Sequence, residues 1–206
     1  MNCEIHQLSP LRCEAFQAKE VLRAVLHTVI FGRALGVVRP RDVDCELFDL
    51  TYVTCGDAEA ERAVDEKLDA LVAWLRKQDL RPGGPDVCAQ VALSFYERRD
   101  KGARWFGGRE ERPCWEQWRI PLEVFAGDDQ AAKEREQRSL ELQDVLRGAV
   151  QHALGLVNEK RDHIPPVVSA DVVSFPFDIG LPGDTESAFG TLKRMMMHAS
   201  PPNMIT

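Results

Sequence analysis

Residues 87–124 read VCAQVALSFY ERRDKGARWFGGREERPC WEQWRIPLEV, and this stretch decides the fold class. Apolar side chains alternate with smaller or polar ones near its start and again near its end, which is the period-two pattern of strands with one buried face. A polar loop at 96–114, which contains glycine, separates the two patterns. The stretch therefore predicts two antiparallel strands joined as a hairpin.

Three other segments have the apolar spacing of amphipathic helices. The first is expected to end near Gly32, because glycine terminates helices readily. The second covers about 58–77, and the third covers about 131–159 without an internal proline. One face of the second helix is expected to pack on the sheet through Leu68, Leu71 and Leu75.

Further strands are expected at about 3–8, 42–55 and 172–177, and Pro176 would confine the last to a sheet edge or a bulge. The sequence thus predicts an α+β fold in which three long helices cover an antiparallel sheet. We expect 1–180 to form one domain and 181–206 to be a weakly patterned C-terminal segment.

Composition restricts the class of function. The chain has 206 residues, 44% hydrophobic and 29% charged, which suits one globular domain. Its formal net charge of -7 argues against a general nucleic-acid binder. The start of the chain has no basic segment followed by an apolar run, and its six cysteines form no Cys-x-x-Cys pair. We therefore expect a cytoplasmic protein with reduced thiols, no zinc and no other cofactor.

Nucleotide-binding and catalytic motifs are not found, so we do not expect an enzyme. Cys3 and His6 have a spacing that a metal could use, but two further ligands are unassigned, which favours a small thiol and an exposed histidine. His27 beside an apolar stripe is interpreted as a core or boundary histidine, and Cys114 as a packed thiol. The carboxylates between 42 and 49 are interpreted as solvated.

The loop at 98–109 contains the one feature that resists a structural explanation, the adjacent Trp105 and Phe106. Both side chains carry a large apolar area, yet glycines and charges surround them, so no strand or helix continues through them. They could bind a protein partner, fold back on the sheet, or contact RNA or lipid. We regard partner binding as the best of these interpretations.

Four segments resemble a known family: AVLHTV at 24–29, DVDCELFDLTYV at 42–53, SFYE at 94–97 and CWEQW at 114–118. Their residues agree in order with the autophagy-related protein 101 family. The resemblance implies a HORMA domain and a non-catalytic scaffold of the autophagy-initiation kinase complex. Such a scaffold binds and stabilises the HORMA domain of autophagy-related protein 13 as a heterodimer.

The resemblance also implies a recruitment finger. In this family a Trp–Phe finger recruits downstream factors to the preautophagosomal assembly site, and it maps here onto Trp105 and Phe106. Family fingers can place a proline between the two aromatic residues, whereas here they are adjacent and are followed by Gly107 and Gly108. Membrane association would then be indirect, through the assembled complex.

The third helix offers a candidate for the heterodimer interface. A helical wheel places one apolar stripe against the sheet, made of Leu142, Val145, Leu146, Ala149, Ala153 and Val157. Leu140, Val150 and Leu154 lie to one side of it, with Arg147 between them. Because the resemblance implies that HORMA pairs meet through this helix, we expect Leu140, Arg147 and Leu154 to contact the partner. The alternative is a single broad core face.

A different class of function remains open for the loop at 98–109. Its basic residues, with the aromatic pair as a wedge, could form a module that binds a lipid or membrane surface. The basic residues are Arg98, Arg99, Lys101 and Arg104.

Overall fold

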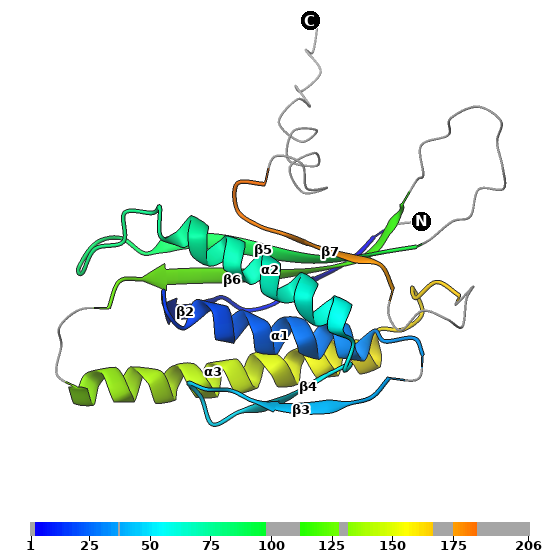
Figure 1. The fold of residues 1–206 in the computed structure, drawn as a ribbon, viewed down its shortest axis with the longest axis horizontal. Helices are drawn as coiled ribbons and strands as arrows, with labels where there is room; N and C mark the ends of the chain where they lie inside the picture. Colours follow the sequence, from blue (N-terminus) through cyan, green and yellow to red (C-terminus); the bar gives the residue numbers. More distant parts are fainter. Residues whose placement is uncertain (1–2, 37, 98–111, 128–131, 167–174, 185–206) are drawn as a thin grey trace, which may run out of the picture.

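The computed structural model describes residues 3–36, 38–97, 112–127, 132–166 and 175–184. Within them lie a five-stranded sheet, a separate two-stranded hairpin and three helices (Figure 1). The strands of the large sheet are β1 (Glu4–Gln7), β2 (Leu11–Glu14), β5 (Val87–Tyr96), β6 (Cys114–Phe125) and β7 (Phe177–Gly180). The mixed α and β composition that the sequence predicts is confirmed.

The large sheet is mixed, so the prediction of an antiparallel sheet is wrong in part. Its order is β1-β6-β5-β7, and β2 also pairs with β6. β5 is antiparallel to both β6 and β7, whereas β1 and β2 are parallel to β6. Between β1 and β2 the Leu8 amide donates to the Arg119 carbonyl at 3.0 Å. The two short strands therefore follow each other along the same edge of β6, both parallel to it. The period-two pattern of a single strand does not reveal that direction.

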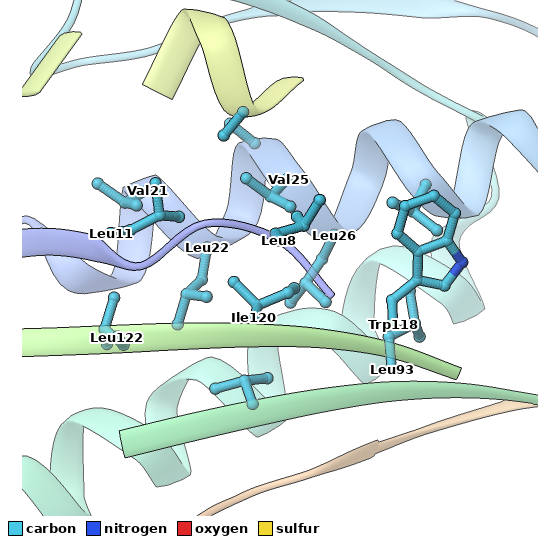
Figure 2. Packing of buried hydrophobic residues seen from close by; sticks show 14 of the residues in the cluster. Leu8, Leu11, Val21, Leu22, Val25, Leu26, Leu93, Trp118, Ile120 and Leu122 are labelled. Atoms are coloured by element: carbon cyan, nitrogen blue, oxygen red, sulfur yellow. The ribbon is translucent and has the colours of Figure 1, made fainter. Parts of the chain in front are cut away.

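Helix α1 (Ala18–Gly32) lies at the centre of the molecule. Most of its side chains are buried, because it contacts α2 (Ala58–Leu75), α3 (Ala132–Glu159) and β4 (Thr51–Thr54) as well as the sheet (Figure 2). Figure 1 shows α1 between the sheet and α3. Figure 2 shows the apolar packing between α1 and β6, which includes Leu22, Leu26, Ile120 and Leu122. A helix with a wide apolar surface suits such a position, and its charged Lys19 and Arg23 pair with Asp69 and Asp65 of α2.

Helices α2 (Ala58–Leu75) and α3 (Ala132–Glu159) begin close to where the sequence predicts them. The Asp57 side chain caps α2 by accepting from the Glu59 amide at 3.1 Å, and acidic residues in the first turn suit the helix dipole. Leu68, Leu71 and Leu75 are buried, as expected from their common face.

The segment at 42–55 is two strands and not one. β3 (Arg41–Asp44) and β4 (Thr51–Thr54) form an antiparallel hairpin, which the Cys45 amide closes on the Leu50 carbonyl at 2.9 Å. The turn between them contains neither glycine nor proline, so turn chemistry gives no signal there. Phe48 in this turn is buried and anchors the hairpin to the core.

The last strand pairs at the edge of the sheet, as expected, but it begins at Phe177. Pro176 lies just before this strand and accepts a hydrogen bond from the Tyr96 amide through its carbonyl, at 2.8 Å. Proline lacks an amide proton but keeps its carbonyl, so it can pair in this way. Of the expected strand at 172–177, residues 172–174 lie outside the described ranges, and 175–176 are not in a strand. None of the described helices combines the length and apolarity needed to cross a membrane.

Candidate functional site

Leu140, Arg147 and Leu154 are spaced seven residues apart on α3, and we call them the α3 stripe. A spacing of seven is close to two helical turns, so the three share one side of the helix. The structure leaves Leu140 56% and Leu154 39% exposed. Two large apolar side chains thus face outward from a helix whose opposite side is buried.

The buried side of α3 packs mainly on α1 and meets the sheet at β2, so the expectation that this helix covers the sheet is wrong in part (Figure 1). It also differs from the predicted stripe at two positions. Val145 was expected in the core but is 48% exposed, and Val150 was expected beside the core but is buried. On a helical wheel Val150 falls next to Val157, whereas Val145 lies beyond Ala149 at the other margin. The contact of α3 with α1 therefore centres closer to Val150 than the apolar pattern alone indicates.

The β3–β4 turn packs beside the α3 stripe. Arg147 donates from Nη1 to the Asp144 carboxylate at 2.8 Å and from Nη2 to the Asp49 carbonyl at 3.2 Å. The Asp49 amide donates to Gln143 Oε1 at 2.8 Å. Leu47 in the same turn is 40% exposed. The hairpin and α3 thus form one continuous surface with apolar residues on both elements.

A small cavity of about 230 Å³ lies on the other side of α3, between that helix and β2. The Arg12 guanidinium lies 4.5 Å and that of Arg138 5.7 Å from the centre of the Phe125 ring. Stacked cations and an aromatic ring of this kind stabilise packing. The lining of this cavity includes Arg12, Glu14, Gln17, Phe125, Ser139 and Glu141.

The predicted finger residues Trp105 and Phe106 lie outside the described residues. The structure does describe the two strands that flank the finger segment, β5 and β6. Beyond these strands the Glu97 amide donates to the Pro113 carbonyl at 3.1 Å. The antiparallel hairpin that the sequence predicts is confirmed up to this point.

A buried charged cluster, which the sequence interpretation missed, lies where β1, β6 and the end of α1 meet. Glu116 is fully buried, and Arg33 donates to its carboxylate from Nε at 2.9 and 3.1 Å. His163 Nε2 lies 2.5 Å from the same carboxylate, and the Trp118 indole also donates to it. The nearest signal in the sequence is the acidic residue between two tryptophans at 115–118, but its partners are distant in the chain.

The same cluster offers three side chains of metal-ligating types, since atoms of His6, Glu116 and His163 all lie within 4.8 Å of one another. His6 is 5% exposed, so the expectation of an exposed histidine is wrong. Burial lowers the pKa of His6, which keeps the ring neutral. However, Arg33 already compensates the Glu116 charge, so a divalent cation would add uncompensated positive charge to a buried site. The cluster fits a structural ion pair better than a metal centre.

The remaining candidates have structural explanations. His27 is 4% exposed and stacks on Tyr52 with ring centres 5.8 Å apart, so its interpretation as a core histidine is confirmed. Burial lowers the His27 pKa from 6.5 to about 4. The Cys3 sulfur contacts the Cys114 sulfur and does not form a ligand set with His6. The carboxylates between 42 and 49 are exposed, as expected.

Comparison with known proteins places the chain beside one family. The family model of autophagy-related protein 101 matches residues 10–171. Autophagy-related protein 101 of Arabidopsis thaliana is 38% identical over 222 aligned residues, which cover 100% of both chains. The protein of the same name from Homo sapiens is 30% identical and covers 88% of this chain and 84% of its own. The one from Schizosaccharomyces pombe is 29% identical over 87% of this chain and 88% of its own.

Proposed function

This chain belongs to the autophagy-related protein 101 family, and we propose that it is a non-catalytic scaffold of the autophagy-initiation kinase complex. In this proposal it binds and stabilises the HORMA domain of autophagy-related protein 13 and recruits downstream autophagy factors through Trp105 and Phe106. Residues 1–180 form its own HORMA domain, followed by the segment 181–206. The protein is cytoplasmic and is recruited to the preautophagosomal assembly site.

The observation that carries the proposal is the exposure of Leu140 and Leu154 on α3. Fully burying a leucine side chain contributes about 1.5–3 kcal/mol relative to leaving it in water. The two residues are separated by about 21 Å along the helix, a span that a folded partner domain can cover. Arg147 lies between them, and arginine is enriched at the centres of protein interfaces.

The contacts of Arg147 support a surface that is ordered before binding. Its hydrogen bonds to Asp144 and to the Asp49 carbonyl hold the guanidinium between α3 and the β3–β4 turn. A side chain held in this way loses less conformational entropy when a partner arrives. Because α3 also packs on α1, a partner bound to α3 would stabilise the core by mass action.

The arrangement of layers supports two separate binding surfaces. Strands β5 and β6, which flank the finger segment, belong to the sheet, whereas α3 lies on the far side of α1 (Figure 1). A partner on α3 would therefore leave these two strands free. This separation suits a scaffold that holds one protein and recruits another.

Calorimetric titration against the HORMA domain of autophagy-related protein 13 tests the proposal. Leu140→Asp and Leu154→Asp should each weaken binding by at least about tenfold, because a charge would be buried in the interface. Val145→Asp is the matched control, since Val145 is equally exposed on the other margin of the same helix. Circular dichroism should show the same folded state in all three variants.

Wild-type affinity in both leucine variants, or an equal loss in Val145→Asp, would contradict the proposed interface. The lipid-binding interpretation of 98–109 is tested separately by flotation with anionic vesicles in the absence of any partner. Association of the chain alone with those vesicles, lost on neutralising Arg98, Arg99, Lys101 and Arg104, would favour a membrane module instead.

A further inference from the structure

Cys3 and Cys114, 111 residues apart in the chain, bring their sulfur atoms to 2.9 Å. Both residues are partly exposed, and both are free thiols. A disulfide needs its sulfurs to approach to about 2.05 Å, so only a small movement separates this contact from a bond. We propose that Cys3 and Cys114 are a redox modification site, which a peroxide oxidant converts to a reversible intramolecular disulfide.

The pairing of the strands explains why the two thiols meet. In the parallel ladder Glu4 pairs with Glu116, so a regular continuation would place Cys3 opposite Trp115. The pairing of β5 with β6 is irregular there. Phe95 pairs with Glu116 and the next residue, Tyr96, pairs with Cys114, so Trp115 is left as an extra residue on β6. Such a bulge interrupts the alternation of side chains. It therefore turns Cys114 to the side on which Cys3 lies.

The electrostatic environment favours reaction at Cys3. The hydrogen bond between the two sulfurs lowers the Cys3 pKa and raises the Cys114 pKa. The thiolate is the nucleophile in thiol chemistry, so Cys3 is the attacking group. Burial raises the pKa of three other thiols, to about 12 for Cys13 and to about 11 for Cys45 and Cys55.

The reaction balances with hydrogen peroxide as the oxidant. The Cys3 thiolate attacks one peroxide oxygen, the O–O bond breaks, and a sulfenic acid forms with release of hydroxide. The Cys114 thiol then loses its proton to that hydroxide, and its sulfur attacks the sulfenic sulfur. The S–S bond forms and a second hydroxide leaves, which becomes water on taking a solvent proton. In total, two thiols and one peroxide give one disulfide and two waters.

The test uses the full chain, titrated with hydrogen peroxide, blocked with iodoacetamide and digested with trypsin. Cys3 falls in the peptide 1–12 and Cys114 in 110–119, because Pro113 prevents cleavage after Arg112. Each peptide contains one cysteine, so a linked pair identifies the bond without ambiguity. The linked pair should dominate at low peroxide, be about 2 Da lighter than the two reduced peptides together, and disappear with dithiothreitol.

Two substitutions and a control complete the experiment. Cys3→Ser and Cys114→Ala should each abolish the linked pair, whereas Cys88→Ser should leave it unchanged, since Cys88 is exposed on β5. Cys114→Ala should also slow the alkylation of Cys3 at neutral pH, because Cys3 loses the sulfur contact that lowers its pKa. Thermal melts of the reduced proteins verify that every variant is folded.

The bond should also raise the melting temperature of the wild type. Closing the chain from Cys3 to Cys114 restricts the unfolded state, so the oxidised protein should melt about 5–10 °C above the reduced one. Linkage of other cysteine pairs in equal yield, or predominance of intermolecular dimers, would overturn the proposal. So would alkylation of Cys3 at the same rate in the wild type and in Cys114→Ala.

Discussion

Arg33 and Glu116, 83 residues apart in the chain, form a buried ion pair in which the side chains are 1% and 0% exposed. Arg33 also donates to the carbonyls of Val157 and Lys160, at 2.9 and 3.0 Å, where α3 ends. One guanidinium thus joins the end of α1, the strand β6 and the C-terminal end of α3. Its positive charge also interacts favourably with the negative, C-terminal end of the α3 dipole.

Arg33→Met should lower the free energy of unfolding by about 3–5 kcal/mol, because Glu116 would remain buried without its countercharge. Urea denaturation measures the loss. The control is Arg81→Met, whose pair with Asp79 is exposed on both sides and should leave the unfolding midpoint unchanged. Equal midpoints for the Arg33 variant and the wild type would show that the pair contributes nothing.

Stability should fall in weak acid through His27. Its pKa is about 4 in the folded protein against 6.5 for the free group, so the unfolded chain binds the proton first as pH falls. The contribution is fully present above about pH 6.5 and is lost as pH falls toward about 4. Between pH 7.5 and 5.0 the wild type should lose about 2 kcal/mol more than His27→Gln. Urea titrations at both pH values measure the difference, and identical losses would exclude this role.

Leu71→Ala should cost about 2–5 kcal/mol, because the side chain is 0% exposed between α2 and the core. Leu140→Ala provides the matched control on α3, where 56% exposure predicts a change within about 0.5 kcal/mol. Chemical denaturation of the two variants compares them directly. Similar costs would mean that Leu140 is packed in the free protein.

The double variant Trp105→Ala with Phe106→Ala should keep the wild-type melting temperature and the affinity for the HORMA partner, but it should lose recruitment of downstream autophagy factors. A pull-down with identification of bound proteins measures recruitment. A fall in stability comparable to that of Leu71→Ala would show instead that the aromatic pair is structural.

The spacing of apolar residues in the sequence predicts the long helices and strands. The three helices and the strands β5 and β6 were found because each carries many apolar residues at its own period. The short strand β2 was missed. The split of 42–55 into a hairpin was missed because its turn lacks glycine and proline.

The site was predictable to the extent that it lies on one helix. The outward side of α3 follows from a helical wheel, and Leu140 and Leu154 are exposed as that wheel allows. The wheel shows which residues share a face but not which line of that face contacts α1. For this reason the sequence predicts a buried Val145 and a marginal Val150, whereas the structure has Val145 exposed and Val150 buried. The Cys3–Cys114 contact depends on the parallel pairing of β1 with β6, and the Arg33–Glu116 pair depends on the end of α1 meeting β6. No local pattern contains either relationship.

That parallel pairing has a consequence for the order of events during synthesis. β1 and β2 leave the ribosome first, yet both find their hydrogen-bonding partner only in β6, about a hundred residues later. At typical translation rates of about 5–20 residues per second, they wait roughly 5–20 s. Leu8 and Leu11, which are buried in the folded core, lack the β6 side of their packing during that interval. The nascent chain thus carries an unpaired apolar segment that suits capture by a chaperone, and its first strands are among the last to become fixed.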